Sequence, residues 1–455
     1  MLEALVAAGM DVARVSFAHS TTDQAIDLIR RIRKIAPRVG ILPDLPGPKI
    51  RSSAFPKRGV VLDAGAEVVI APGSEAPSSS ATRIGVAVDE VVASLLEGDL
   101  VSLGDGGISL VVLGRRGDDV VARVRSGGRV LGRPGVTVPS DRITLATPTP
   151  EDLARVAALA AEGLEAIAVS FVRRSEDIDA VRDALGPSDT MLVAKIETAE
   201  AISNLDSIVK SADAVMVARG DLGIRLPLED VPFHQKEIIR CGVRFARPVI
   251  TATQMLESMI SSPVPTRAEV SDVANAILDG TSAVMLSGET AIGVDPVNVV
   301  STMSRIVERA ERDFDYLNWG AGLGLQEVSG DAPLRRITAA ITGAAWRAAL
   351  EEDVAAIIAC THSGATARAI SRFRPSMPIV AVTPHERTAH QLQMSWGVEV
   401  ILSEHPGSTD EGIWSAVQKA VTAGFASAGD VVVVLAGSPY EKDPVADTLR
   451  LVRIP

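Results

Sequence analysis

Two short stretches decide the fold: Met191–Glu197, which reads MLVAKIE, and Ala214–Asp221, which reads AVMVARGD. Each is an apolar run that is bounded by polar residues and ends in charged side chains. Buried parallel strands read in this way when their last residues emerge into a site. Because alternate residues of a strand share one face, we expect Lys195 and Glu197 to project together. This pattern is compatible with a buried salt bridge and with a catalytic pair.

Two further predicted strands carry polar groups at their carboxyl ends only. Pro248–Gln254 (PVITATQ) ends in Thr253 and Gln254. Ala283–Glu289 (AVMLSGE) ends in Ser287 and Glu289. Four successive strands with this asymmetry are typical of the catalytic face of a β/α barrel.

Composition narrows the class of protein. A chain of 455 residues exceeds one ordinary domain, and its 47% hydrophobic but only 3% aromatic content is typical of helix-flanked parallel sheets. The net charge of −12 argues against non-specific nucleic-acid binding, which needs a basic face. Cys241 and Cys360 suit neither a disulfide framework nor a zinc site, and no apolar run approaches the ~20 residues of a membrane span. We therefore expect a cytoplasmic protein without nucleic-acid or membrane partners.

The alternation of strands and helices predicts the domains. Seven strands precede about Arg312, one short of a closed eight-stranded barrel, and the missing first strand would lie before Met1, either upstream of a misplaced start or lost. Between them, short β-branched segments separated by Gly, Asp and Ser predict an inserted β domain. We expect an α/β protein in which 1–48 and 141–318 form a (β/α)8-type barrel, 49–140 a small β-barrel lid, and 334–455 a C-terminal α/β domain. Residues 313–333 are predicted to be a glycine-rich link.

Seven motifs occur in the order in which pyruvate kinases carry them, and the chain resembles that family from Met1 to about Ala436. They are GMDVARVSFAH (9–19), GPKIR (47–51), AKIE (194–197), MVARGDLG (216–223), TATQMLESM (251–259), PTRAEVSDVANAILDGT (265–281) and VMLSGETA (284–291). The resemblance implies an inserted lid, a regulatory C-terminal domain and a homotetramer. It also implies phosphoryl transfer from phosphoenolpyruvate to ADP, giving pyruvate and ATP in glycolysis.

Two other functions remain open. Another magnesium-dependent barrel enzyme acting on pyruvate enolates would share the Lys, Glu and Asp strand ends, but would not need Arg51 or the lid. A catalytically impaired paralogue that binds metabolites and regulates a partner would explain the missing strand.

The resemblance implies roles for the residues at the strand ends. Glu197 and Asp221 would hold Mg²⁺, with Mn²⁺ as an alternative. Lys195 would stabilise charge on the transferring phosphoryl group and on the enolate. Gly220, which has no side chain, would let the backbone approach the substrate carboxylate, and Thr253 would lie over the carboxylate or the enolate methylene.

Further roles follow from the same resemblance. Ser287 and Glu289 could order a water that delivers the proton to the enolate. Arg14 matches a phosphate-contacting arginine of the family. This role suits its side chain, because a guanidinium group can donate two hydrogen bonds to phosphate oxygens. Arg51 and His19 match nucleotide-site residues.

Two regions depart from the family pattern. The lid's nucleotide-contacting lysine aligns near Pro134, and we expect Arg133 beside it to act as a substitute. Potassium-dependent members hold K⁺ with Asn, Ser, Asp and Thr and carry a Glu where this chain has Lys49. Here Lys49, placed near Asp44, would supply the positive charge of K⁺, so we expect that K⁺ is not required.

A loop in the last domain resembles the loop with which the family binds an effector phosphate. We expect it to hold a phosphorylated effector at Thr361, Ser363, Gly364 and Thr366.

Overall fold

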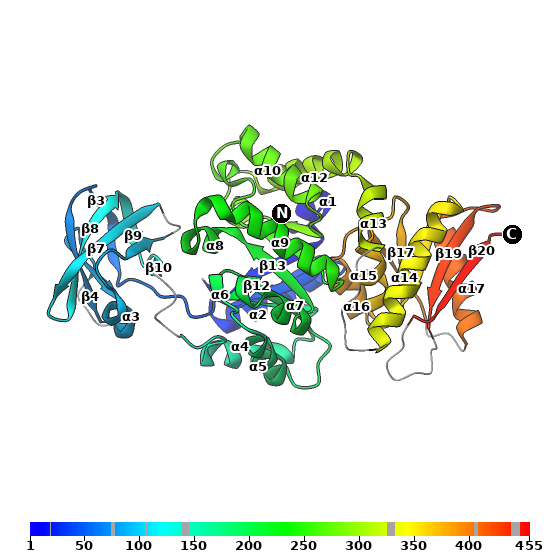
Figure 1. Cartoon of the computed structure of the whole chain (residues 1–455), viewed down its shortest axis with the longest axis horizontal. Helices are drawn as coiled ribbons and strands as arrows, with labels where there is room; N and C mark the ends of the chain where they lie inside the picture. The colour runs from blue at the N-terminus through cyan, green and yellow to red at the C-terminus, as the bar shows by residue number, and fades with distance from the viewer. Residues whose placement is uncertain are drawn as a thin grey trace.

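The computed structural model describes residues 1–18, 20–73, 78–104, 107–138, 145–324, 333–404, 408–437 and 446–455. Figure 1 shows three bodies in a row: a β domain at one end, a helix-flanked parallel sheet in the middle, and a second α/β unit at the other end. The chain passes through the middle body twice, since the β domain is inserted into it.

Seven parallel strands form the central sheet, as the sequence predicted. In sheet order they are β1 (Val12–Ser16), β2 (Gly40–Asp44), β11 (Ala166–Val169), β12 (Met191–Ile196), β13 (Ala214–Ala218), β14 (Val249–Ala252) and β15 (Ala283–Met285). Every residue of β2 and of β11 to β14 is buried. Burial on both faces explains why these strands read as continuous apolar runs rather than alternating ones.

Helices flank this sheet and connect its strands. They are α1 (Leu2–Ala7), α2 (Thr22–Ile35), α4 (Pro150–Ala160), α5 (Ser175–Leu185), α6 (Ala199–Ser203), α7 (Leu205–Ser211), α8 (Arg219–Arg225), α9 (Val231–Arg244), α10 (Arg267–Leu278), α11 (Gly288–Ala291) and α12 (Pro296–Arg312), with short 3-10 helices η2 (Leu228–Asp230) and η3 (Glu257–Ile260). Thr21, Thr149 and Thr266 each begin a helix with a capping box, which satisfies two otherwise unpaired N–H groups.

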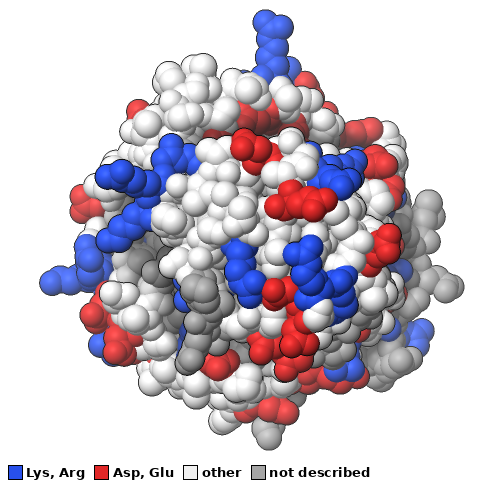
Figure 2. All heavy atoms as spheres, turned by 90° about the vertical axis from the view of Figure 1, so that its left-hand side faces the viewer, with Lys and Arg blue, Asp and Glu red and all other residues white. Residues whose placement is uncertain are grey.

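The inserted segment is a β domain, as predicted. A six-stranded sheet has the order β10 (Val136–Thr137), β6 (Leu100–Leu103), β7 (Ile108–Arg116), β8 (Asp119–Ser126), β4 (Glu67–Pro72) and β5 (Arg83–Val86). A two-stranded antiparallel sheet of β3 (Phe55–Leu62) and β9 (Gly128–Gly132), together with the helix α3 (Asp89–Ser94), completes it. On the end of the molecule formed by this domain, Figure 2 shows basic and acidic residues interspersed.

The last body is a five-stranded sheet with helices on both faces. Its strands are β18 (Val398–Leu402), β17 (Ile379–Thr383), β16 (Ala356–Cys360), β19 (Val431–Ala436) and β20 (Thr448–Arg453), and only β20 runs antiparallel. Its helices are α14 (Pro333–Glu351), α15 (Ala365–Ser371), α16 (Glu386–Leu392) and α17 (Thr409–Thr422).

One prediction of the sequence was wrong in part. Residues 316–324 lie in the expected link but form helix α13 (Tyr316–Gly324). Its glycine at position 320 is needed for close packing, because a Cβ there would lie 2.3 Å from the ring of Trp346. Aromatic packing of Trp319 against Phe314 adds to the contacts that hold this helix, and these contacts outweigh the cost of glycine in a helix.

Glu165, just before β11, joins the central body to the C-terminal unit. Its carboxylate contacts Arg33 at 3.0 Å and His390 Nδ1 at 3.3 Å, and its main-chain oxygen accepts a 3.0 Å hydrogen bond from Gln391. The same carboxylate accepts the N–H of Ile41 in β2 at 3.3 Å. The C-terminal unit is therefore tied directly to the amino ends of the central strands. No helix among the described residues is long and apolar enough to cross a membrane.

Candidate active site

Asp44 is the centre of a charged cluster at the carboxyl ends of β1, β2 and β12. Arg14 donates from Nε to Asp44 Oδ2 at 2.7 Å, and its Nη2 lies 2.6 Å from the same oxygen. Lys195 Nζ donates to Asp44 Oδ1 at 3.2 Å. The parallel sheet brings these side chains together, since Arg14 lies in the middle of β1, Asp44 ends the adjacent β2, and Lys195 is the next-to-last residue of β12.

Lys195 is buried and contacts three oxygen groups. Besides Asp44, its ammonium group donates to Ser170 Oγ at 2.6 Å and lies 2.9 Å from Glu197 Oε1. The salt bridge between Lys195 and Glu197 that their strand spacing allows is therefore present. It does not remove Lys195 from the site, because Asp44 and Ser170 hold the same ammonium group.

The neighbouring charges fix the protonation states of this pair. Burial alone would raise the pKa of Asp44, but the charges of Lys195 and Arg14 outweigh burial and lower that pKa. Burial would lower the pKa of Lys195, but the charges of Asp44 and Glu197 outweigh it and raise that pKa. At neutral pH the cluster thus presents a fixed ammonium and a fixed carboxylate.

Glu197 is fully buried and only partly compensated. Its Oε2 accepts the N–H of Phe171 at 2.9 Å, whereas within the described residues its Oε1 accepts no hydrogen bond of good geometry, although Lys195 lies near it. Burial is the main cause that raises the pKa of Glu197, and the negative charge of Asp221 adds to it. A cation between Glu197 and Asp221 would relieve both effects.

Asp221 lies in the first turn of α8, which follows β13 directly. The strand before α8, β13, lies next to β12 in the sheet. This explains why the negative charge of Asp221 raises the pKa of Glu197. Across the described ranges no group of three or more His, Cys, Asp or Glu side chains could hold a metal by itself. Two carboxylates are nevertheless a donor set that suits Mg²⁺, which takes its other ligands from water and substrate oxygens.

Thr253 and Gly220 are joined by a hydrogen bond across the ends of β13 and β14. Thr253 Oγ1 accepts the N–H of Gly220 at 2.7 Å and donates to the carbonyl of Ala252 at 2.6 Å. Thr253 and Gln254 have φ values of 69° and 54°, a conformation that costs of order 1–3 kcal/mol for residues other than glycine.

Arg219 holds this strained pair in place. Its Nη2 donates to the carbonyls of Thr253 and Gln254 at 2.9 and 3.3 Å, and its Nη1 donates to Asp272 at 2.7 Å. The main chain that carries the Thr253 hydroxyl is therefore held in place by a largely buried arginine side chain.

Ser287 and Glu289 follow β15 and are held by the backbone. The two carboxylate oxygens of Glu289 accept the N–H groups of Leu256 at 3.2 Å and Ser287 at 2.7 Å. The buried Ser287 Oγ has no hydrogen-bond partner among the described residues. Glu289 therefore shapes the loop, and the hydroxyl of Ser287 is the group that can bind a water or a ligand.

The predicted nucleotide residues lie where the β domain meets β1 and β2. Arg51 donates to the carbonyls of Arg133 at 3.1 Å and Ala18 at 3.4 Å, so it bridges the two bodies. Arg133 is exposed and donates to the carbonyl of Ser52 at 3.3 Å. Lys49 is also exposed, and its Cε would lie 3.1 Å from a Cβ built on Gly135. His19 lies outside the described residues.

Two family models match the chain. One, described as pyruvate kinase, barrel domain, covers residues 1–300, and the other, described as pyruvate kinase, alpha/beta domain, covers residues 339–452. The chain belongs to the pyruvate kinase family.

Curated relatives agree with this assignment. A pyruvate kinase of Clostridium acetobutylicum is 37% identical over 99% of this chain and 95% of its own length. One of Methylorubrum extorquens is 39% identical over 99% and 93%, and one of Geobacillus stearothermophilus is 39% identical over 96% and 74%. The fold class and the enzyme class that the motifs indicated are confirmed.

Reasoning from the sequence missed two residues of this pyruvate kinase site. Ser170, which binds Lys195, directly follows β11 and could have been found by the rule of polar carboxyl ends applied to a fifth strand. Arg219 stands inside a quoted motif, but no pattern showed that it clamps the carbonyls of the Thr253 loop.

The predicted effector loop precedes α15 in the C-terminal unit. The N–H of Gly364, which has a φ of 79°, donates to Thr361 Oγ1 at 3.0 Å. Thr366 is buried and Ser363 is exposed. The loop thus has an ordered turn, and its ligand stays a prediction.

Proposed function

We propose that this chain transfers the phosphoryl group of phosphoenolpyruvate to ADP, giving pyruvate and ATP. The observation that carries the proposal is the cluster of Arg14, Asp44 and Lys195 at the carboxyl ends of the strands, in a member of the pyruvate kinase family. In this reaction the enol oxygen–phosphorus bond breaks, a bond forms between phosphorus and a β-phosphate oxygen of ADP, and the enolate carbon takes up a proton.

The two cations would act on the transferring group. Arg14 can present its remaining N–H groups to phosphoryl oxygens while Nε and Nη2 stay on Asp44. Lys195, kept as an ammonium by Asp44 and Glu197, would stabilise the charge on the phosphoryl oxygens and on the enolate oxygen. Asp44 would position both cations without touching the substrate.

The residues present fit a divalent cation. Glu197 and Asp221 would hold Mg²⁺, with Mn²⁺ as an alternative, because they form a carboxylate pair with an oxygen that lacks a hydrogen bond. When bound, the ion would neutralise charge on the phosphoryl oxygens.

Other residues would bind the substrate's remaining groups. The backbone at Gly220 and the hydroxyl of Thr253 lie together and would face the carboxylate or the methylene of the substrate. The hydroxyl of Ser287 would bind a water for enolate protonation, in a loop that Glu289 holds. Arg51, Arg133 and His19 would contact the nucleotide beneath the inserted domain. The barrel domain would comprise residues 1–48 and 141–318. Residues 49–140 would act as the lid, and residues 334–455 as the regulatory domain.

Pyruvate release from phosphoenolpyruvate and ADP in the presence of Mg²⁺ tests the proposal. We expect ADP-dependent turnover that falls by at least ~10³-fold in Lys195→Met, because the fixed cation at the reacting group is lost. Lys210→Met, which removes an exposed lysine, is the matched control and should retain full activity. Turnover that persists in Lys195→Met, or that does not need ADP, would reject this assignment.

Potassium dependence is a second prediction. Lys49, together with Asp44, would replace the monovalent cation, so we expect equal activity in KCl and in choline chloride at the same ionic strength. Lys49→Glu should make the activity depend on K⁺. A large stimulation of the wild type by KCl would contradict this part of the proposal.

A further inference from the structure

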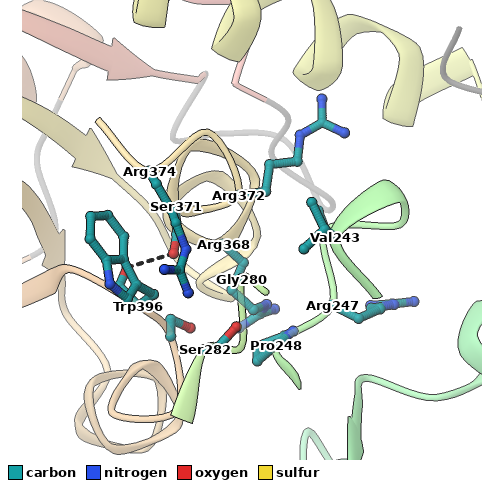
Figure 3. A pocket seen from close by; sticks show the side chains of 12 residues that line it. Val243, Arg247, Pro248, Gly280, Ser282, Arg368, Ser371, Arg372, Arg374 and Trp396 are labelled. Carbon is teal, nitrogen blue, oxygen red and sulfur yellow. Dashed lines mark hydrogen bonds between the residues drawn. The ribbon is translucent and has the colours of Figure 1, made fainter. Parts of the chain in front are cut away.

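A second positively charged site lies at the opposite end of the central strands from the cluster around Asp44. The pocket lies between the turns that lead into β14 and β15 on one side and α15 with the loop before β18 on the other. It encloses about 330 Å³ of non-atom space, including the part open to solvent. Figure 3 shows Arg247 on the side of the central body and Arg368, Arg372 and Arg374 on the side of the C-terminal unit, with the guanidinium group of Arg372 pointing away from the other labelled side chains.

The lining is strongly cationic. Four of its residues are arginines, and none of them that the structure describes is an aspartate or glutamate. Arg247 contacts Asp213 at 3.7 Å, and that carboxylate also binds Arg182 at 3.1 Å. Positive charge in the pocket is therefore only partly compensated.

Arg374 is a structural member of this group. It donates to the carbonyls of Ile277, at 3.2 Å, and of Thr281, and its guanidinium lies 4.6 Å from the ring centroid of Phe314 and 5.0 Å from that of Trp396. These contacts fasten the C-terminal unit to the central body. Because these contacts give Arg374 a structural role, we do not expect it to bind a ligand.

Arg368 is different, because its polar atoms are not all used. Its Nη2 donates to the carbonyl of Ser363 at 2.9 Å, but its Nη1 is shielded from solvent and finds no acceptor in the described parts of the chain. Burial, and then the nearby charge of Arg247, lowers the pKa of Arg368 to about 10. Two like charges thus approach one another across the boundary between the two bodies.

Two more donors in the lining share this property. Arg372 Nε and Ser395 Oγ are buried and make no hydrogen bond with any residue that the structure describes. Buried donors are nearly always satisfied in folded proteins, and an unsatisfied one costs about 1–3 kcal/mol. Two of these donors, Arg368 Nη1 in α15 and Ser395 Oγ in the loop before β18, come from separate segments that line one cationic pocket, and they indicate a missing anion.

We propose that this pocket binds a phosphate group, either inorganic phosphate or the phosphate of a small metabolite, between Arg247 of the central body and Arg368 of the C-terminal unit. A tetrahedral dianion has enough oxygens to accept from guanidinium groups on two sides and from the Ser395 hydroxyl. The site is separate from the catalytic cluster, since it lies at the amino ends of the strands. It adjoins the 361–366 loop, whose Ser363 carbonyl Arg368 contacts, but differs from that loop because the central body supplies half of the lining.

Isothermal titration in phosphate- and sulfate-free buffer tests the proposal. The probes are inorganic phosphate, glucose 6-phosphate and AMP, with glucose and adenosine as controls that lack the phosphate. We expect a phosphate-dependent binding event that weakens at least ten-fold in Arg368→Gln and also in Arg247→Gln. Arg450→Gln, which removes an arginine that pairs with Asp410 on the surface, should bind as the wild type does.

The pattern across variants identifies the site. Loss in Arg368→Gln without loss in Arg247→Gln would move binding to the 361–366 loop and overturn the proposal. Loss in Arg51→Gln alone would move it to the catalytic site and overturn it equally. Unchanged affinity in both pocket variants, or no phosphate binding by the wild type, would reject it. Equal affinity for inorganic phosphate and the esters would identify free phosphate as the ligand, and tighter binding of one ester would identify a metabolite.

A folding defect would be recognised separately. Arg368→Gln removes one of two neighbouring like charges and should leave the thermal midpoint of the ligand-free protein unchanged or raise it. Ser395→Ala deletes only a hydroxyl and should weaken phosphate binding several-fold in a folded protein. A Ser395→Ala protein that binds phosphate as tightly as the wild type would contradict the assignment of that hydroxyl and of the pocket.

Discussion

The two ends of the central strands differ in how far their positive charges are compensated by carboxylates. At the carboxyl ends, Arg14 and Lys195 each contact the buried carboxylate of Asp44. At the amino ends, the pocket lining brings Arg247 and Arg368 together, and the carboxylate that acts on both, Asp213, lies outside the lining and also binds Arg182. A fully compensated pair of cations stays charged and positioned whether or not substrate is present, whereas a partly compensated pair favours the state in which an anion is bound. The first arrangement suits turnover, and the second suits retention of a ligand.

Removing the compensating carboxylate should have the largest effect. Asp44→Asn leaves Arg14 and Lys195 without their common partner, so we expect kcat/KM to fall by ~10³-fold or more and the free energy of unfolding to fall by about 3–5 kcal/mol. Steady-state pyruvate release and urea denaturation measure the two quantities.

Asp27→Asn is the control, because Asp27 is an exposed carboxylate of α2. A wild-type level of activity in Asp44→Asn would show that compensation at the carboxyl ends is unnecessary, and the comparison would fail.

An intermediate effect is expected for Arg374→Met, which separates structural from ligand-binding arginines in the pocket. The carbonyls of Ile277 and Thr281 would lose their donors and three aromatic rings would lose a cation, so we expect a loss of about 2–4 kcal/mol in the free energy of unfolding. Urea denaturation measures it, with Arg450→Met as the control. A loss no larger than that in Arg368→Gln would mean that the two arginines do not differ in role.

The smallest effect should come from Glu165, a compensated carboxylate at the same boundary. Burial would raise its pKa, but hydrogen bonding to His390 and the charge of Arg33 lower that pKa below the ordinary 4.5. A lowered carboxyl pKa adds stability that is present above the ordinary value and is lost as the pH falls through the lowered one. Glu165→Gln should therefore cost about 1–2 kcal/mol at pH 7 and progressively less below pH 4.5.

Chemical denaturation across pH measures this difference. Glu162→Gln, which removes the partner of the exposed Arg30, should show little pH-dependent loss. A Glu165→Gln penalty that stays constant down to pH 3 would show that its ionisation does not contribute.

The central sheet could be predicted because its strands are apolar throughout and end in polar residues. β20 was missed because Thr448–Arg453 alternates apolar and charged residues at the edge of a sheet, with a pattern that resembles a surface segment. Helix α13 was missed because its glycines suggest a loop, and only the three-dimensional packing of Trp346 against Gly320 reveals their purpose.

The site was predictable to a similar degree. The strand-end rule placed Lys195 and Glu197 on one face, as their 2.9 Å contact confirms. Sequence spacing could not show that Asp44 bridges Arg14 and Lys195, because Lys195 lies 151 positions from Asp44 in the chain. The arginine pocket was equally invisible, since it exists only where two bodies of the chain meet.

Strand β2 connects the features discussed above within a single segment. Ile41, whose N–H binds Glu165 at the boundary with the C-terminal unit, and Asp44, which holds the catalytic cations, lie three positions apart on this fully buried strand. That separation is about 10 Å of extended chain. One end of this buried strand lies at the domain boundary and the other lies in the catalytic cluster. The docking of the C-terminal unit and the placement of the phosphoryl-binding cations therefore depend on the same rigid segment.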